Sequence, residues 1–440
     1  MDKKLIPTGY KQTDLGLIPH DWAVKTLNEL AERISVGIAS AATHAYSDRG
    51  VPFLRNQNIK PNRLDDSDIL FIKNEYESLF SNKRLRAGDL ITARTGYPGT
   101  TCIVPQKYEN AQSFTTLVTR LKTGESNPEF ICFYMNSEGG QKFFELNQIG
   151  GGQKNVNASI LRTLTIPFPK NEEQTAIANA LSDVDALIAA LEKLINKKSA
   201  IKTAAMQQLL TGKKRLPPFD QLNTGYKQTE FGKIPSDWEL STIGQNTHWM
   251  SGGTPSRKND AYWSGKIPWI SGSTLKSAEI STSDQFLTAE AIDVGSQMAP
   301  LNSTLLLVRG SALHNEIRAG LVVAPVSFNQ DVKALIPIGS VAPKYLTLYL
   351  LGMNSNLLKL VSSAGNSAGV LDTELVQNFY FFKPSKLEQI AIENALSEMD
   401  KDLDAIQQRL NKTQQIKQGM MQELLTGKTR LVKPQGDAIA

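Results

Sequence analysis

The 440-residue chain contains few of the residues that build disulfide frameworks or metal sites: two cysteines and four histidines. Cys102 and Cys132 lack metal-ligand spacing and are too few for a disulfide framework, so they suit a reducing compartment. The sequence contains no run of about 18 apolar residues, so it predicts no membrane span. The polar start of the chain also lacks the apolar segment of a secretory signal. We therefore expect a cytoplasmic protein that does not contact a membrane.

The sequence also lacks the common catalytic motifs. Gly427-Lys428-Thr429 resembles the end of a phosphate-binding loop, but Gln422 stands where that loop needs its first glycine. We find no dinucleotide-binding glycine fingerprint, nucleophile elbow, paired-carboxylate site or Asn-Pro-Pro-aromatic tetrapeptide of an amino-methyltransferase. The four histidines have no metal-ligand spacing. Because the sequence motifs of nearly all these enzyme classes are absent together, the sequence favours a binding protein with no catalytic residues, metal or cofactor of its own.

What the chain does contain is a long internal repeat. Residues 171–216 return as residues 386–431, without an insertion between the copies. The motif Gly-Tyr-Lys-Gln-Thr, followed by Gly-x-Ile-Pro-x-Asp-Trp, occurs at 9–22 and again at 225–238. Each copy thus has an opening motif, a globular part and a long helix. The predicted boundaries are opening motif 1–25, globular domain 26–170, helix 171–216, second opening motif 217–240, globular domain 241–385, helix 386–431 and tail 432–440.

Both globular parts are predicted to be mixed α/β. Short segments rich in β-branched residues and bounded by turns, at 89–94 and 114–120, predict strands, and 304–309 matches the first of them. Residues 128–146 predict one helix, matched by 343–351. We expect Trp22 and Trp238 to be buried and to act as hydrophobic anchors.

The two long helices carry heptad stripes. Apolar residues recur at steps of four and three, at Ile177, Leu181, Val184, Ile188, Leu191, Ile195 and at Ile392, Leu396, Met399, Leu403, Ile406, Leu410. Beyond them we expect the stripe to change phase: Lys198 and Lys202 fall on it, while Ile201, Ala205 and Leu209 take over. A helix with such an apolar stripe needs a partner, which is either the other copy or another chain, and the shared phase change favours the other copy. If the two helices pack antiparallel, the globular parts lie at opposite ends and the chain has an internal pseudo-two-fold axis.

Several polar and basic residues suit contacts with nucleic acid. The chain has 48 Lys and Arg against 43 Asp and Glu, which permits but does not demand such a partner. Basic residues suit phosphates, and Asn, Gln, Lys or Arg in loops suit base edges. The candidates are Arg55, Gln57, Asn58, Lys73, Lys83, Arg84, Arg94, Gln153, Lys154, Asn155, Arg257, Lys258, Lys266, Ser273, Lys276, Arg309 and Asn366. Taken singly, such a residue is more often a solvated loop residue than a DNA contact, but two matched sets of loops favour a binding surface.

The combination of motifs resembles the specificity subunit of type I restriction–modification systems. The resemblance rests on both opening motifs, on Gly252-Gly253-Thr254-Pro255-Ser256, on the Glu-Gln-x-x-Ile helix starts and on the Leu-Leu-Thr-Gly-Lys helix ends. Copy one departs from the frame, because Gly37-Ile38-Ala39-Ser40 replaces Gly-Thr-Pro-Ser.

The resemblance implies that each globular part reads one half of a bipartite, asymmetric site in double-stranded DNA, in a prokaryotic cell. The paired helices then act as a spacer. Two modification subunits, which carry S-adenosylmethionine and methylate adenine N6, dock on the chain near Thr211-Gly212-Lys213 and Thr426-Gly427-Lys428. Restriction subunits that use ATP and Mg²⁺ join the complex. The alternative is a coiled-coil adaptor protein without base readout.

Overall fold

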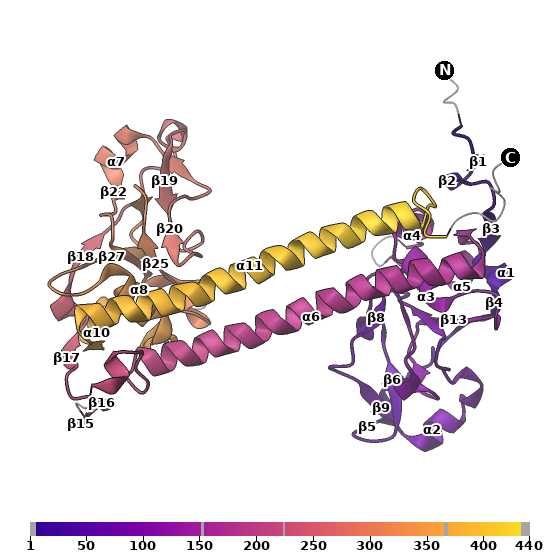
Figure 1. The fold of residues 1–440 in the computed structure, drawn as a ribbon, viewed down its shortest axis with the longest axis horizontal. Helices are drawn as coiled ribbons and strands as arrows, with labels where there is room; N and C mark the ends of the chain where they lie inside the picture. Colours follow the sequence, from indigo (N-terminus) through magenta and orange to yellow (C-terminus); the bar gives the residue numbers. More distant parts are fainter. Residues whose placement is uncertain (1–5, 151–153, 223–224, 365–367, 433–440) are drawn as a thin grey trace. The chain divides into compact units, whose positions relative to one another are not determined.

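A computed structural model describes residues 6–150, 154–222, 225–364 and 368–432. The chain forms two compact units: unit 1 comprises residues 1–192 and 408–440, and unit 2 comprises residues 193–407. Each unit contains a globular part and one segment of each long helix (Figure 1). The helices are α6, Asn171–Leu209, and α11, Lys386–Leu424.

Unit 1 is built on two four-stranded sheets. The main sheet has the order β11-β10-β13-β4 with antiparallel neighbours, and the second sheet has the order β12-β6-β9-β5. A hairpin, β1–β2, opens the chain, and β3 pairs with β14 just before α6. The strands are β1 Tyr10–Thr13, β2 Gly16–Pro19, β3 Ala23–Thr26, β4 Ala31–Val36, β5 Tyr46–Ser47, β6 Val51–Leu54, β7 Ile59–Lys60, β8 Arg63–Leu64, β9 Leu70–Ile72, β10 Leu90–Thr92, β11 Thr101–Ile103, β12 Gln112–Ser113, β13 Leu117–Leu121 and β14 Thr165–Phe168; the short helices are α1 Leu27–Leu30, α2 Asn74–Ser78, α3 Pro128–Met135, α4 Glu138–Asn147 and α5 Ala158–Arg162.

Unit 2 repeats this plan with additions. Its main sheet has the order β18-β27-β23-β25-β20, its second sheet the order β21-β19-β26-β22, and a third sheet, β24-β29-β28, is added. The strands are β15 Tyr226–Thr229, β16 Gly232–Pro235, β17 Glu239–Thr242, β18 Thr247–Ser251, β19 Ile267–Ile270, β20 Glu279–Ile280, β21 Phe286–Leu287, β22 Gln297–Met298, β23 Thr304–Leu307, β24 Arg309–Gly310, β25 Ala319–Val322, β26 Ser327–Phe328, β27 Val332–Pro337, β28 Val361–Ala364, β29 Ala368–Leu371 and β30 Tyr380–Lys383; the short helices are α7 Ala289–Gly295, α8 Pro343–Gly352, α9 Asn354–Leu358 and α10 Thr373–Gln377.

The mixed α/β class, the tandem repeat and the long helices are confirmed, but the helices end at Leu209 and Leu424 and not at 216 and 431. Two predictions within the first globular part are also wrong. The single helix expected over 128–146 is two helices, because the Ser137 hydroxyl accepts a hydrogen bond from the Gly140 N–H and caps a new helix, α4. The strand expected at 114–120 starts only at Leu117. Thr115 delays it because its backbone has φ of +51°, which no strand residue adopts.

In each unit, the local segments of α6 and α11 run antiparallel and are joined by ion pairs. In unit 2, Lys198 pairs with Asp402 at 2.9 Å, and Lys202 pairs with Asp400, so numbers rise on one helix as they fall on the other. In unit 1, Lys417 pairs with Asp185 at 2.5 Å. The Lys417–Asp185 pair is the repeat equivalent of Lys202–Asp400. The same local ion pair between the two helices therefore recurs in both units.

The predicted phase change of the heptad stripe is wrong. Ile201 and its equivalent Ile416 are 50% and 49% exposed, so neither joins the stripe. The seven-residue pattern instead continues through Lys198 and Lys202 to Ala205 and Leu209. The ammonium groups stay on the facing side because acidic residues of α11 neutralise them there.

Buried aromatic residues anchor the core of each unit to the helices. In unit 1, Trp22, Phe130 and Phe144 pack with apolar residues from the start of α6 and the end of α11. In unit 2, Trp238, Tyr345 and Phe381 pack with the end of α6 and the start of α11. Both tryptophans are 1% exposed, which confirms their predicted role as hydrophobic anchors.

Candidate nucleic-acid interface

In unit 1, several loops leave the main sheet at the same end. Thr92, the last residue of β10, is paired with Leu117, the first residue of β13, and Leu117 is also paired with Val36, the last residue of β4. The loops after β4 and β10 and the loop before β13 therefore meet. We call the segments that gather here the unit-1 loop cluster: residues 37–40, 55–58, 93–100, 113–116 and 154–156.

Backbone hydrogen bonds hold this cluster together. The Asn56 side chain accepts from the Arg94 N–H at 2.8 Å and donates to the Thr115 hydroxyl at 3.2 Å. The Val156 N–H donates to the Arg94 carbonyl at 3.1 Å, and Ile38 N–H donates to Ser113 at 2.7 Å. Arg94 is thus fixed through its own backbone between two loops that are distant in the sequence.

Unit 2 builds the same cluster from different residues. Leu307 at the end of β23 is paired with Val332 at the start of β27, and β18 ends beside them. Arg309 N–H donates to the Asp331 carbonyl at 3.2 Å, and Gly253 N–H donates to Phe328 at 2.9 Å. The unit-2 loop cluster comprises residues 252–257, 271–276, 308–318, 329–331 and 368–371.

The two clusters share a backbone frame and differ in their side chains. In unit 1 the Arg55 N–H donates to the Asn58 side chain at 2.9 Å, and in unit 2 the Ser271 N–H donates to the Thr274 hydroxyl at 2.8 Å. Gly253 N–H to Phe328 is likewise the repeat equivalent of Ile38 N–H to Ser113. Copy one therefore keeps the frame's position although its Gly-Ile-Ala-Ser sequence departs from the motif.

The turn at 55–58 contains a compact polar group. Asp68 accepts hydrogen bonds from the Arg55 guanidinium at 2.8 Å and the Gln57 amide at 3.0 Å. Asn58 is different: it is 2% exposed, and its side chain bonds the backbone of Arg55, Asp65 and Asp68. Asn58 shapes the turn and is withdrawn from the contact surface, whereas Arg55 and Gln57 remain candidates.

Three predicted basic residues of unit 1 lie outside the loop cluster. Lys73 is exposed before α2. The Lys83 amine donates to the Gly37 carbonyl at 2.8 Å, at the edge of the cluster. Arg84 forms two hydrogen bonds with the buried carboxylate of Glu77, at 2.7 and 2.8 Å, which lower the pKa of Glu77. Arg84 holds Glu77, and with its side chain 45% exposed it remains a candidate, as Arg55 does beside Asp68.

Of the remaining candidates within the described residues, Lys154, Asn155, Arg257, Ser273, Lys276 and Arg309 belong to the cluster segments, whereas Lys258 and Lys266 lie outside them. Lys154 is exposed, Asn155 is half-buried, and Asn155 exchanges backbone hydrogen bonds with Ile149. In unit 2, Lys258, Lys266, Ser273, Lys276 and Arg309 are exposed. The Arg257 guanidinium lies 3.7 Å from the ring centre of Trp263, which fixes its direction by a cation–π contact. Gln153 and Asn366 lie outside the described residues.

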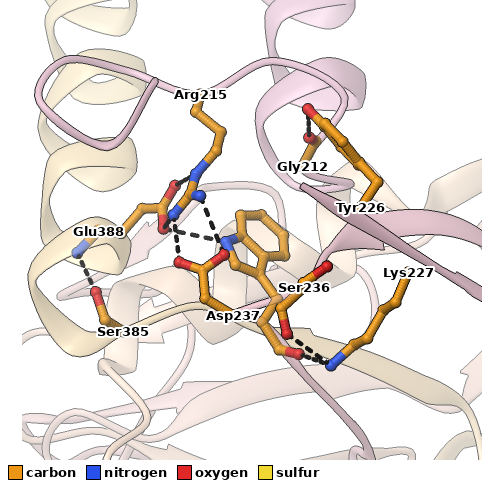
Figure 2. A network of polar contacts seen from close by, with 9 residues as sticks. Gly212, Arg215, Tyr226, Lys227, Ser236, Asp237, Ser385 and Glu388 are labelled. Atoms are coloured by element: carbon orange, nitrogen blue, oxygen red, sulfur yellow. Dashed lines mark hydrogen bonds and ion pairs between the residues drawn. The ribbon is translucent and has the colours of Figure 1, made fainter. Parts of the chain in front are cut away.

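A second group of hydrogen-bonded side chains, which was not predicted from the sequence, lies in each unit where a long helix starts. In unit 2, Arg215 forms paired hydrogen bonds with Glu388, at 2.8 and 2.7 Å, and with Asp237, at 3.0 and 2.8 Å (Figure 2). Trp238 donates its indole N–H to the same Glu388 carboxylate at 3.0 Å. We call this group the clasp. The Arg215 and Glu388 side chains are only 7% and 1% exposed.

Unit 1 contains the equivalent clasp, formed by the opening motif, the start of α6 and the segment that follows α11. Arg430 forms paired hydrogen bonds with Glu173, at 2.6 and 2.8 Å, and with Asp21, both at 2.9 Å, while Trp22 donates to Glu173 at 3.0 Å. The signal was present in the sequence, because Arg, Asp-Trp and Glu all recur at the repeat spacing. The Glu of the Glu-Gln helix start therefore has a structural role.

Each clasp sits beside the glycine that ends the preceding helix. Gly212 and Gly427 have φ of +69° and +71°, as predicted for a glycine that stops a helix. A Cβ atom at Gly427 would lie 2.4 Å from the Pro19 ring, so the close approach also demands glycine. The tyrosine hydroxyls of the opening motifs, Tyr10 and Tyr226, donate to the carbonyls of these glycines at 3.0 and 3.2 Å.

The unit-1 clasp should weaken in acid. The hydrogen bonds from Arg430 lower the pKa of Asp21 below its ordinary value of 3.8. A lowered carboxyl pKa in the folded state stabilises the fold fully above the unfolded pKa, and this stabilisation is lost as pH falls through the folded pKa. We expect the wild type to lose unfolding free energy between about pH 4 and pH 2 more steeply than Asp21→Asn, measured by urea unfolding. Equal pH dependence of the two proteins would contradict this assignment.

Two features are absent from the described ranges. No cluster of three or more His, Cys, Asp or Glu residues there is arranged to bind a metal ion. None of the described helices combines the length and apolarity needed to cross a membrane.

Comparison with known proteins places the chain in a family. The family model of the type I restriction modification DNA specificity domain matches twice, at residues 19–202 and 235–418. The specificity subunit of the Escherichia coli type I restriction enzyme EcoR124I/EcoR124II is 26% identical over 259 residues, which span 58% of this chain and 60% of that protein. The specificity subunit of the MjaVIII enzyme of Methanocaldococcus jannaschii is 22% identical over 94% of both chains.

A solved structure has the same fold. The type I restriction–modification system S subunit from M. genitalium aligns with a TM-score of 0.54 and 17% identity, covering 92% of this chain and 96% of that one. The resemblance predicted from the motifs is confirmed. With two copies of the domain over most of its length, the chain belongs to the type I restriction modification DNA specificity family.

Proposed function

We propose that this chain is the non-catalytic DNA specificity subunit of a type I restriction–modification complex, and that each loop cluster binds one half of a bipartite, asymmetric site in double-stranded DNA. The observation that carries the proposal is the pair of matched clusters. Equivalent hydrogen bonds donated by backbone N–H groups shape both clusters, and the clusters carry different side chains, including Arg55 and Gln57 in one and Ser273 and Lys276 in the other. A shared frame with two different surfaces suits two different half-sites.

In this proposal the chemistry belongs to partners. Two modification subunits carry S-adenosylmethionine and methylate adenine N6, and restriction subunits use ATP and Mg²⁺, all in the prokaryotic cytoplasm. A groove of about 980 Å³ in unit 1 supports a docking site at the end of α11. It lies between α4, the opening hairpin and α11, and its lining includes Glu138, Gln418, Met421, Thr426 and Lys428. Thr426 and Lys428 belong to the segment where the sequence predicts docking.

The test is a gel-shift panel with the chain assembled with its modification subunits. We expect one split site to bind at least tenfold tighter than scrambled DNA, with affinity that falls steeply as salt rises, because basic side chains displace counterions from phosphates. Equal binding of all sequences would contradict the proposal and favour the adaptor alternative. Deleting both globular parts would then leave function intact.

The helices should set the gap between half-sites. Four residues inserted after Ile195 in α6, with a matching insertion after Leu410 in α11, lengthen the pair by roughly 6 Å. The insertions leave the Asp185–Lys417 and Lys202–Asp400 pairs intact on either side. We expect the preferred gap to grow by about one or two base pairs, since one pair spans about 3.4 Å.

Binding selection on a library of sites with varied gaps measures this preference. Alanine substitutions at Asn196, Lys197 and Ser199 change the same region without changing its length, and they should leave the gap unaltered. An unaltered gap in the insertion variant would contradict the spacer role.

A further inference from the structure

One exposed aromatic residue stands in the unit-1 loop cluster. Tyr97 is 82% exposed, the highest value among the large hydrophobic side chains of the described residues. It lies at the tip of the loop between β10 and β11, three residues after Arg94. Isolated exposed hydrophobic residues are common and need no function. The support beneath Tyr97 distinguishes it from them.

The loop that carries Tyr97 is braced from several sides. Gly99 N–H donates to the Ala93 carbonyl at 2.9 Å, and Thr100 N–H donates to the Tyr97 carbonyl at 3.2 Å, so the loop closes on itself. Gly99 has φ of +93°, and a Cβ atom there would lie 2.2 Å from the Phe144 ring. The backbone is therefore pressed against α4, and the Gln141 amide donates to the Gly99 carbonyl at 3.4 Å.

The surroundings of the loop suit nucleic acid. Residues 95–100 carry no charge, so nothing in the loop itself repels phosphate. At its base, Arg94 is tied by its backbone to Asn56 and Val156, which brings the exposed Gln57 and Lys154 segments to the same place. A rigid aromatic ring among basic and amide side chains is the arrangement by which proteins stack on bases.

We propose that Tyr97 stacks its ring on a DNA base in the half-site bound by unit 1. This inference rests on the proposed function. A base methylated within a duplex must leave the helical stack, which uncovers the faces of its neighbours. An inserted side chain occupies such an opened step. The corresponding loop of unit 2, residues 309–318, contains no Tyr, Trp or Phe, so the contact is particular to one half-site.

The test compares Tyr97→Ala with Tyr97→Phe in the full chain assembled with its modification subunits. Tyr97→Ala should bind the specific site about 10-fold more weakly, within the range of about 5- to 150-fold seen when a stacked aromatic is removed. Tyr97→Phe should bind within twofold of the wild type, because the ring remains. Both should keep the wild-type thermal unfolding, since the ring is exposed.

Leu301→Ala is the matched control. Leu301 is 57% exposed and precedes β23, at the strand end opposite Arg309, so its loss should leave affinity unchanged. A second measurement places 2-aminopurine in the unit-1 half-site. Its fluorescence should be higher in the Tyr97→Ala complex than in the wild-type complex, because the ring that quenches it is absent. In the Tyr97→Phe complex the fluorescence should stay as low as in the wild type.

Four outcomes overturn the inference. The first two concern affinity: Tyr97→Ala binds within twofold of the wild type, or Tyr97→Phe loses as much affinity as Tyr97→Ala. The third is equal 2-aminopurine fluorescence in the wild-type and Tyr97→Ala complexes. The fourth is a loss of assembly with the modification subunits, which would make Tyr97 a contact to protein. A wild-type complex without sequence discrimination would overturn the inference and the proposed function together, whereas the first four leave the proposed function standing.

Discussion

Replacing Arg215 by alanine should lower the unfolding free energy of unit 2 by about 3–5 kcal/mol, the cost of removing one partner from a buried ion pair. Glu388, which is 1% exposed in the wild type, then loses both hydrogen bonds from Arg215 and keeps the one from the Trp238 indole N–H. Asp237 also loses its two hydrogen bonds from Arg215. The equivalent substitution, Arg430→Ala, should weaken unit 1 in the same way.

Hydrogen exchange resolves the two units. Amides of β23 and β27 report on unit 2, and amides of β10 and β13 report on unit 1, so each variant should accelerate exchange mainly in its own unit. Lys401→Ala is the control: it removes a surface pair with Glu398 whose side chains are 73% and 71% exposed, and it should leave the free energy of unfolding unchanged within the error of the measurement. An Arg215→Ala protein as stable as this control would contradict the clasp.

Arg94→Ala and Arg309→Ala should each weaken recognition of one half-site and not the other. A basic side chain that contacts a base edge contributes about 1–3 kcal/mol of discrimination, which is roughly a 5- to 150-fold loss of affinity. The two arginines occupy corresponding ends of β10 and β23, each anchored by its own backbone. Their side chains thus project from equivalent frames in different units.

A double-mutant cycle tests this assignment. Scrambling the half-site that an arginine contacts should remove the effect of its substitution, whereas scrambling the other half should leave that effect unchanged. Arg86→Ala is the control, because Arg86 is exposed in unit 1 but precedes β10 at the opposite strand end. Effects that are additive with both half-sites would show that neither arginine belongs to one cluster.

Local features were predictable because they depend on neighbours in the sequence. The heptad spacing fixed the long helices, the repeat fixed the two-unit organisation, and Gly212 marked a helix end. The buried tryptophans followed from the same repeat. Their clasp partners recur at the same spacing, but the repeat does not show which of the recurring residues meet, because Arg430 contacts Asp21 across almost the whole chain.

The composition of the loop clusters could not be predicted for the same reason. Asn56 and Arg94 meet only through the folded sheet, so the sequence could not show that Asn58, two residues on, is buried. Tyr97 also escaped notice, since nothing in its neighbours distinguishes a braced loop from a free one. The phase change at Ile201 was predicted wrongly, because a charged residue was not expected on the apolar stripe. Lys202 stays on the stripe because Asp400 neutralises its charge.

The central claim is that each unit reads one half of a split DNA site. The most direct measurement is a map of methylated adenines in DNA from a host that expresses the whole system, with the wild-type chain and with Arg55→Ala/Gln57→Ala. We expect the wild type to give one asymmetric, bipartite motif with a methylated adenine in each half, and the variant to relax the bases of one half only. A wild-type map without a split motif, or a variant in which both halves change together, would contradict the claim.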